Sequence, residues 1–367
     1  MSPRLNSEEH MATLLNVDDY EHAARERLEA SIYDYIAGGS WDEITLKENH
    51  TAYDKWRLRP RFMVNVEHRD LSVNILGDTL SLPIGIAPSA FHKLMHPDGE
   101  LATARAAGAA GTVMCLSIMA TTSLEEVAAA ASGPLWLQVY IFKDRSLTAD
   151  LAARAKAVGY RALVLTVDTP VLGRRERDSR NQFELPAGIE MRNLNLLPAI
   201  PGEYESPMVR FIKQQIDPSL TWREVEWFVK TVQMPVFVKG VLHPEDARLA
   251  AKCGVSGIIV SNHGGRQLDG AIATLDALPE IVSAMNGTGL NVIVDGGIRR
   301  GTDVVKALAL GAKMVMVGRP VLWGLAVNGE VGARSVLDLL RREFDTALAL
   351  IGCPCASDLN GDFVTRL

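Results

Sequence analysis

Short apolar segments alternate with segments rich in Ala and Leu along the chain from residue 83 onward. The apolar segments have the length and the β-branched content of buried parallel strands, and small or polar residues follow each of them. Eight such segments occur, at residues 83–90, 113–117, 135–140, 162–168, 236–240, 257–262, 291–297 and 314–319. Successive strand ends are separated by roughly 22 to 34 residues, the span of one βα unit, except for about 71 residues after the fourth.

The segments between the predicted strands carry the start and stop signals of helices. Asp98 begins one helix that Gly108 ends, and Pro244 lies in the first turn of another that Gly254 ends. No G-x-G-x-x-G fingerprint follows the first strand, so eight consecutive βα units favour a closed barrel over a doubly wound sheet. We therefore predict an α/β fold, a (β/α)8 TIM barrel.

Two regions fall outside this alternation. Residues 1–80 contain a polar tail and a helical segment at 18–37 that two glycines close, which predicts an N-terminal helical cap. Residues 176–234, after the fourth strand, form an excursion on the face where barrel loops carry catalysis, so we expect a lid or a substrate-gating loop. A tolerated surface insertion is the alternative. The chain 1–367 then forms one domain, with the barrel at 83–350.

Charge and composition exclude several classes of function. The 367 residues include 38 basic and 44 acidic side chains, a net charge of −6, and no basic block, which argues against nucleic-acid binding. No apolar run approaches the roughly 18 residues that would cross a bilayer, and the N-terminus lacks the apolar core of a signal peptide. We expect a cytoplasmic protein with reduced cysteines. The C-terminal Thr365-Arg366-Leu367 resembles a peroxisomal address only loosely, which leaves the peroxisome as the alternative if the source is eukaryotic.

Polar side chains gather where the predicted strands end. Because the carboxyl ends of barrel strands converge at one pole, these side chains form a candidate site. They are Ser117, Gln138, Tyr140, Thr166, Asp168, Lys239, Ser261 to Arg266, Asp295 and Arg319.

The loops after the seventh and eighth strands read V-D-G-G-I-R-R-G (294–301) and V-G-R-P (317–320). These two loops commonly bind phosphate in such barrels. Their glycines let backbone N–H groups approach an anion, and their arginines supply forked, permanently charged donors. The residues concerned are Gly296, Gly297, Arg299, Gly318 and Arg319. We predict a ligand that carries a phosphate.

The sixth strand leads into S-N-H-G-G-R-Q-L-D (261–269), which places His263 and Arg266 in one tight loop. A base beside a fixed positive charge suits this pair, and Asp168 is available across the pole to orient the imidazole. Arg175 follows the fourth strand, and together with Arg266 it indicates a small anionic substrate.

Lys239 and the pair of histidines at 92 and 96 each allow more than one interpretation of their role. Lys239 ends an apolar strand and could be a Schiff-base nucleophile or a fixed cation beside a cofactor that becomes anionic. His92 and His96 have the one-turn spacing of two metal ligands, but no third ligand is apparent, and we expect no metal.

These segments closely resemble the FMN-dependent α-hydroxy acid oxidase family, which includes glycolate oxidase, lactate oxidase and mandelate dehydrogenase. The resemblance covers nearly the whole chain. It rests on Y-D-Y at 33–35, A-P-S-A at 87–90, L-T-V-D-T-P from 165, V-K-G from 238, S-N-H-G-G-R-Q-L-D, D-G-G-I-R-R-G from 295 and G-R-P from 318.

The resemblance implies that FMN lies across the barrel mouth. Implied contacts to the flavin and ribityl chain come from the Ala90 backbone and from Ser117, Gln138, Thr166, Lys239, Ser261 and Asp295. The implied phosphate ligands are Gly296, Gly297, Arg299, Gly318 and Arg319. Lys239 then becomes the cation that stabilises the anionic reduced flavin, which leaves little room for the Schiff-base interpretation.

For the substrate, the resemblance implies that Tyr35, Arg175 and Arg266 bind a carboxylate. Tyr140 would bond near the reacting oxygen, and His263 paired with Asp168 would be the general base. The product is a 2-oxo acid, whether the proton leaves carbon or the hydroxyl. Oxygen is the implied electron acceptor, giving hydrogen peroxide, and the family habit is a homotetramer or homo-octamer.

One position departs from the glycolate-oxidising pattern. Met119 stands where glycolate oxidase has a tryptophan bordering the substrate side chain, and a flexible thioether enlarges or softens the pocket. We therefore predict L-lactate or another aliphatic L-2-hydroxy acid, with aryl acids of the mandelate kind second. The alternatives are the same half-reaction with a different acceptor, an FMN isomerase, a cofactor-free phosphosugar lyase that uses Lys239, and a barrel that only binds.

Overall fold

Eight parallel strands close into a barrel, as the alternation predicts. The computed structural model describes residues 13–194 and 214–367. The barrel strands are β4 (Ile84–Ile86), β5 (Met114–Ser117), β6 (Leu135–Val139), β7 (Ala162–Thr166), β8 (Val236–Val241), β9 (Gly257–Val260), β10 (Asn291–Asp295) and β11 (Met314–Val317). β11 pairs with β4, which closes the ring. Seven of these strands lie within a predicted segment and β8 runs one residue past its segment, to Val241, so the (β/α)8 fold is confirmed.

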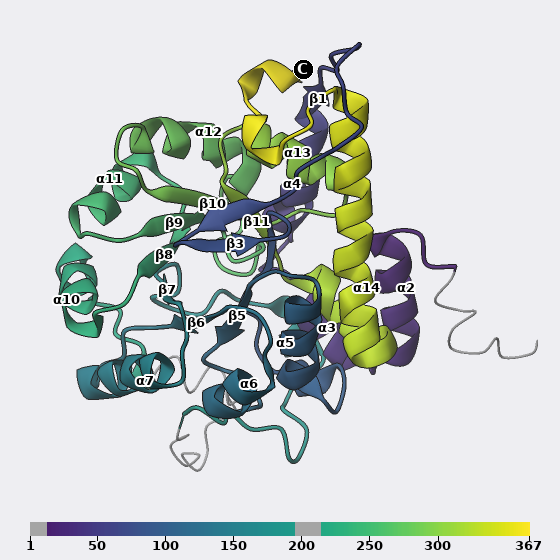
Figure 1. The fold of residues 1–367 in the computed structure, drawn as a ribbon. Coiled ribbons are helices and arrows are strands. Elements are labelled where there is room, and N and C mark those ends of the chain that lie inside the picture. Colours follow the sequence, from purple (N-terminus) through teal and green to yellow (C-terminus); the bar gives the residue numbers. More distant parts are fainter. Residues whose placement is uncertain (1–12, 195–213) are drawn as a thin grey trace, which may run out of the picture.

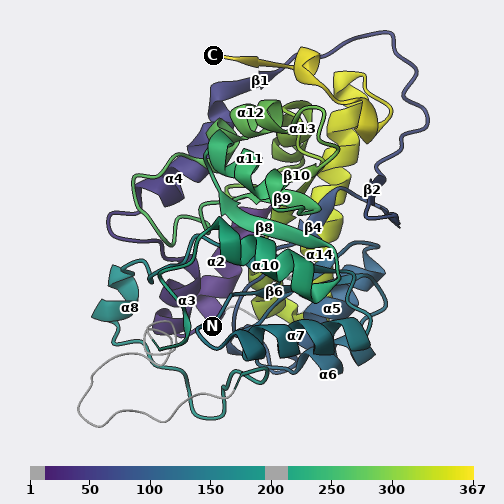
Figure 2. The same cartoon turned by 90° about the vertical axis from the view of Figure 1, so that its left-hand side faces the viewer.

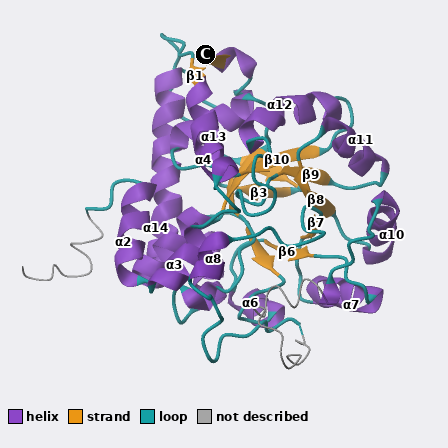
Figure 3. Cartoon of the chain, turned by 180° about the vertical axis from the view of Figure 1, so that it is seen from behind, coloured by secondary structure: helices purple, strands orange, loops and turns teal. Residues whose placement is uncertain are grey.

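Helices surround this barrel (Figure 3). They are α5 (Gly99–Ala109), α6 (Leu124–Ala130), α7 (Arg145–Ala157), α8 (Glu176–Arg180), α10 (Trp222–Val232), α11 (Pro244–Lys252), α12 (Thr274–Met285), α13 (Gly301–Ala309) and α14 (Arg319–Ile351). Pro244 is the first residue of α11, as expected. α14 follows the last strand and bends at Asn328 and Gly329, whose backbone angles are not helical.

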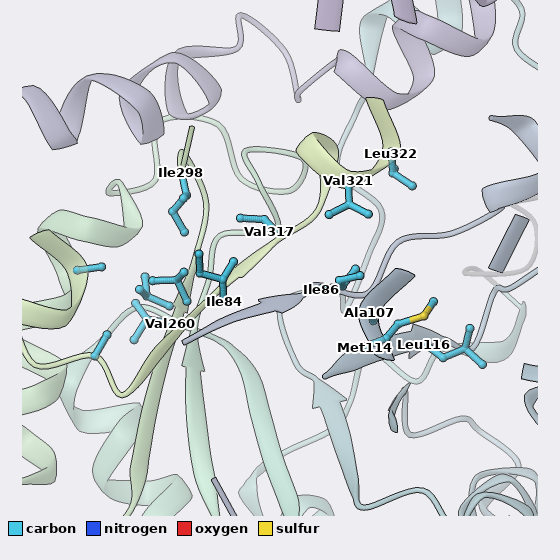
Figure 4. Packing of buried hydrophobic residues seen from close by; sticks show 14 of the residues in the cluster. Ile84, Ile86, Ala107, Met114, Leu116, Val260, Ile298, Val317, Val321 and Leu322 are labelled. Carbon is cyan, nitrogen blue, oxygen red and sulfur yellow. The ribbon is translucent and has the colours of Figure 1, made fainter. Parts of the chain in front are cut away.

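Side chains that alternate along each strand enter two different cores. Met314 and Met316 of β11 pack inside the barrel, where Trp136 stacks on Phe237 with ring centroids 4.7 Å apart. The residues between them pack outward with the helices, and Figure 4 shows members of this outer cluster, among them Ile84, Ile86, Val317 and Val321. This period-2 division follows from the pleat of a strand and leaves no pore.

The N-terminal cap differs from the expectation in one respect. The predicted helical segment 18–37 is two helices, α2 (Val17–Arg27) and α3 (Ala30–Ala37), because Leu28 adopts extended backbone angles. α2 packs against α14 (Figure 1), whereas α3 contacts α8. α4 (Ile44–Thr51) completes the cap.

Two small sheets, which the apolar pattern does not reveal, complete the described chain. β2 (Val73–Ile75) and β3 (Asp78–Leu80) form a hairpin whose apolar residues join the interior core of the barrel. β1 (Trp56–Leu58) pairs with β12 (Val364–Arg366), so the C-terminal residues lie in a sheet. The predicted excursion 176–234 includes α8 and α10, but its centre lies outside the described residues. No helix in the described ranges has the length and apolarity needed to cross a bilayer.

Candidate active site

A cavity of about 1150 Å³, counted with its opening, lies at the carboxyl ends of the barrel strands. Seventeen of the nineteen predicted site residues line it. They are Tyr35, Ala90, Ser117, Met119, Gln138, Tyr140, Thr166, Arg175, Lys239, His263, Arg266, Asp295, Gly296, Gly297, Arg299, Gly318 and Arg319. The other two, Asp168 and Ser261, bond to lining residues from behind.

His263 and Asp168 form a close pair at this cavity. His263 Nδ1 lies 2.8 Å from Asp168 Oδ1, which also accepts a 2.9 Å bond from the Thr169 hydroxyl. Burial lowers the pKa of His263, and the charges of Lys239 and Arg175 lower it further against the opposing effect of Asp168. A neutral imidazole that donates from Nδ1 to the carboxylate leaves Nε2 as a proton acceptor. The pair therefore has the form of an oriented general base.

Asp168 is ionised despite its surroundings. Burial raises the pKa of this carboxyl, but His263 and Lys239 more than offset the effect and hold it below the ordinary value. His263 itself has a left-handed backbone, with φ of 59°, and its N–H donates to the Ser261 hydroxyl over 3.1 Å. This turn fixes the direction of the imidazole at the end of β9.

Tyr35, Arg175 and Arg266 meet at the same cavity. The Arg266 guanidinium lies 5.2 Å from the Tyr35 ring centroid, and Tyr35 shares a side-chain hydrogen bond with Arg175. Arg175 Nε is buried without a hydrogen-bond partner among the described residues. Burial and the charge of Arg175 lower the pKa of Arg266 to about 10. Two adjacent guanidinium groups with unused donors suit a carboxylate ligand.

A second cationic group lies at the end of the cavity formed by the loops after β10 and β11. Burial lowers the pKa of Arg319 to about 9, helped by the charges of Arg266 and Arg299. Burial lowers the pKa of His50 to about 3, and the charges of Arg299 and Arg319 add to this effect. Arg299 Nε is buried without a partner in the described part of the chain. Buried cations that repel one another require an anion, and a phosphate meets that requirement.

The backbone around this group includes a glycine that packs tightly against α4 and a glycine that begins a helix. Gly297 has φ of +79°, and a Cβ there would lie 1.8 Å from the Asn49 carbonyl oxygen. Gly318 caps α14, whose N-terminal N–H groups and partial positive charge reinforce an anion site. Arg319 itself donates to the carbonyls of Ile36, Gly38 and Gly264, which leaves two of its five N–H groups for an anion.

Lys239 of β8 also lines the cavity. Its Nζ lies 3.3 Å from Asp295 Oδ2 and donates to the Ser261 hydroxyl over 2.9 Å. Burial lowers the pKa of Lys239, but the charges of Asp295 and Asp168 more than compensate and raise it. A permanently protonated amine is a poor Schiff-base nucleophile and a good partner for developing negative charge. Asp295 Oδ1 has no hydrogen-bond partner among residues 13–194 and 214–367, which leaves an acceptor for a hydroxyl.

The cavity is also lined by residues outside the predicted set, among them Thr169, Leu172 and Gln267. Gln267 donates to the carbonyls of Asp168 and Val171, so it joins the loops after β7 and β9. Thr169 and Gln267 lie within motifs noted in the sequence and Leu172 follows one of them, but only the folded loops determine which of their side chains face the cavity. The cavity does not involve His92 and His96. His92 is buried against Thr103, and the described residues hold no group of three metal-binding side chains.

The chain is similar to known flavoproteins over nearly its full length. Residues 24–366 match the sequence model of the family described as FMN-dependent dehydrogenase. An L-lactate oxidase from a Nostoc species is 50% identical over 359 residues, covering 95% of this chain and 98% of the relative. The human 2-hydroxyacid oxidase 1 is 48% identical over 346 residues and 93% of each chain.

Solved structures show the same similarity. A mandelate oxidase crystallised with (S)-4-hydroxymandelic acid has a TM-score of 0.91 and 42% identity, covering 96% of this chain and 99% of that one. An oxidised active mutant of (S)-mandelate dehydrogenase has a TM-score of 0.90 and 39% identity, covering 97% of this chain and 100% of that chain.

Proposed function

We propose, from the premise that the chain belongs to the FMN-dependent dehydrogenase family, that it oxidises a small L-2-hydroxy acid to the 2-oxo acid and passes the electrons to oxygen. One observation supports this reaction above the others. The His263–Asp168 pair and the Arg175–Arg266 pair line the same cavity, so a base and a carboxylate site lie together.

FMN supplies a two-electron acceptor when bound. The residues around the cavity fit this cofactor, because unpaired cationic and acidic groups face it where phosphate and hydroxyl groups require partners. In this proposal Gly296, Gly297, Arg299, Gly318 and Arg319 hold the phosphate, and Asp295 bonds the ribityl chain. Ala90, Ser117, Gln138, Thr166, Lys239 and Ser261 contact or support the ring.

The protein groups position the acid and accept its proton. Arg175, Arg266 and Tyr35 bind the carboxylate, which fixes the orientation of the reacting carbon. Burial and the Asp168 charge raise the pKa of Tyr140, so its hydroxyl stays protonated and donates to the reacting oxygen. His263 Nε2 accepts one proton, and the substrate also gives up two electrons and its second hydrogen. That hydrogen leaves with the electrons as hydride if the base takes the hydroxyl proton, or as the hydroxyl proton if the base takes the proton from carbon. Departure of the proton from carbon or from the hydroxyl gives the same oxo acid.

The apolar wall favours an aliphatic substrate. Met119 and Leu172 line the cavity, and both are flexible, unbranched or γ-branched side chains rather than rings. The similarity to an L-lactate oxidase agrees with L-lactate as substrate, and the similarity to mandelate oxidase makes an aryl 2-hydroxy acid the second candidate.

Anaerobic reduction of the bound flavin tests cofactor, reaction and pocket together. Glycolate, L-lactate, longer aliphatic acids and mandelates would be mixed with the holoenzyme, each enantiomer separately. We expect L-lactate or a longer aliphatic L-acid to bleach the flavin fastest. A yellow protein that no hydroxy acid bleaches would instead indicate an isomerase, and a colourless protein would indicate a lyase.

The electron acceptor and the assembly are separate parts of the proposal. The relatives named as oxidases favour oxygen, and one hydrogen peroxide per oxo acid under air is the expected yield. Negligible peroxide with normal turnover of an artificial acceptor would make the protein a dehydrogenase. We further propose a homotetramer or homo-octamer in the cytoplasm or, in a eukaryote, the peroxisome, which sedimentation and cell fractionation test.

A further inference from the structure

The short helix after Arg175 is tied to the N-terminal cap by an ionic bridge. Arg177 of α8 donates to Glu43 Oε2 over 2.5 Å and to Asp34 Oδ1 of α3 over 3.3 Å. Asn181 adds a 2.8 Å bond to the other oxygen of Asp34. Figure 2 shows α8 lying beside α3, and the two helices are in contact.

The bridge packs closely against the main chain at Gly38 and Gly39. Glu43 also accepts a 2.9 Å bond from the Gly39 N–H, so its carboxylate contacts both the cap and Arg177. A Cβ at Gly38 would lie 3.3 Å from Arg177 Cδ. The main chain after α3 therefore passes close to the Arg177 side chain.

An aromatic stack joins the same two segments closer to the cavity. The rings of Phe183 and Tyr35 are stacked with centroids 4.5 Å apart and planes 11° from parallel. Phe183 is held in turn by a 2.9 Å bond from its N–H to the Asp178 carbonyl. One face of Tyr35 is thus covered by a residue that follows α8, and its hydroxyl points toward the arginines.

We propose that Arg177 and Phe183 are positioning residues that set Tyr35 and Arg175 in one arrangement for the substrate carboxylate. This inference rests on the proposed function. His263, Asp168 and Arg266 lie at or just beyond the ends of barrel strands, whereas Tyr35 and Arg175 come from the cap and from a long loop. Arg266 and Arg319 hold the main chain of the cap around Tyr35, whereas the bridge and the stack act on the Tyr35 ring and on the segment that carries Arg175.

The expected effect falls on substrate binding rather than on the chemical step. The bridge contacts neither His263 nor Asp168, and a carboxylate is bound equally in the ground state and the transition state. Arg177 is partly exposed, with a 35% accessible side chain, and such pairs contribute little to folding stability. Losing the bridge should therefore misplace the ligands without unfolding the protein.

Arg177→Ala tests the bridge, and Arg180→Ala is the matched control. Arg180 lies on the same helix, is 72% exposed and pairs with Glu176 within the helix. For Arg177→Ala we expect KM for L-lactate to rise on the order of 10-fold with kcat within about 2-fold, and the control to match the wild type. The Kd of 2-hydroxy-2-methylpropanoate, a hydroxy acid with no proton to lose from its α-carbon, should rise by the same factor. Flavin absorbance reports that Kd without turnover.

Further variants at Phe183 and Glu43 distinguish a loss of positioning from misfolding. Phe183→Leu should raise the same KM and Kd, and Phe183→Tyr, which keeps the stack, should restore them. Glu43→Gln should resemble Arg177→Ala, and the double variant should be no worse than either single one because they remove the same bridge.

Several results would overturn the inference. Unchanged KM and Kd in Arg177→Ala, or a loss of kcat with Kd constant, would remove the positioning role while leaving the proposed function intact. The wild-type protein could instead bind the unreactive acid but oxidise no hydroxy acid. If Arg177→Ala still weakened this binding, the proposed function alone would be overturned and the positioning role would stand. Absence of binding in the wild type would overturn both.

Discussion

His263 illustrates how neighbouring charges set the behaviour of one side chain. Its imidazole is half enclosed, bonded to Asp168 on one side and open to the cavity on the other. Burial and two cations lower its pKa, and one carboxylate opposes them. The result is a base that is unprotonated at neutral pH and still held in one tautomer.

This balance predicts a pH profile. Turnover requires neutral His263, so kcat/KM should be flat near neutral pH and fall as pH drops through the lowered pKa of His263, below the ordinary value of about 6.5. Asp168→Asn removes the charge that raises this pKa, so the acid limb should move to still lower pH. The same variant should lose kcat/KM on the order of 10³-fold, because an amide does not fix the tautomer. A limb that stays in place would assign the profile to another group.

Met119 carries a prediction about substrate size. Met119→Trp places a rigid ring against the substrate side chain, so the ratio of kcat/KM for L-lactate to that for glycolate should fall by about 10-fold or more. Met119→Leu, a change of nearly equal volume, is the control and should leave the ratio close to that of the wild type. Equal ratios in all three proteins would place the side-chain pocket elsewhere.

At the scale of elements, the loop after β10 depends on how closely it packs against α4. Gly297→Ala would drive a Cβ into the Asn49 carbonyl, at 1.8 Å, and displace the loop that carries Arg299. We expect the Kd of the apoprotein for FMN to rise by at least about 10-fold, because even 1.4 kcal/mol of displaced contact has that effect. Gly287→Ala is the control, since its φ of +78° is nearly identical and no atom lies within 4 Å of its Cβ. Fluorescence quenching of FMN on binding measures both.

The elements also show which structures can be predicted from the sequence. The eight barrel strands were recognisable because buried parallel strands form continuous apolar runs, and the site residues because such strands end at one pole. The break at Leu28 lacks a glycine or proline, and β1, β2, β3 and β12 have three residues each, too few for a period to show. Arg319 was predicted as a phosphate donor from its loop, but its bonds to the Ile36 and Gly38 carbonyls arise only when the cap folds over it.

At the scale of the molecule, a net charge of −6 conceals a cationic pole. Arg175, Lys239, Arg266, Arg299 and Arg319 all line the cavity, and burial lowers the pKa of three of them. Folding therefore gathers like charges that an anion must balance. The overall charge argues against nucleic-acid binding, whereas the buried cations of the cavity favour a substrate with a carboxylate and a ligand with a phosphate.

This imbalance predicts that anions stabilise the apoprotein. Inorganic phosphate and FMN should each raise its Tm, and FMN at a free concentration 100 times its Kd should add about 2.7 kcal/mol to the free energy of unfolding. Sodium chloride at equal ionic strength is the control and should have a smaller effect, because screening acts weakly on buried charges. A Tm that responds equally to chloride and phosphate would contradict a specific phosphate site.

Arg266 and Arg319 hold the cap by hydrogen bonds to its main chain, at the carbonyls of Tyr35, Ile36 and Gly38. Carbonyl oxygens are common to all residues, so this attachment places almost no demand on side-chain identity along the segment. A protein engineer could therefore transplant the cap from a distant relative and keep the joint, provided that the path of the backbone past Gly38 is preserved. Side chains of the cap would then be constrained chiefly where they contact the cavity or Arg177, as Tyr35, Asp34 and Glu43 do.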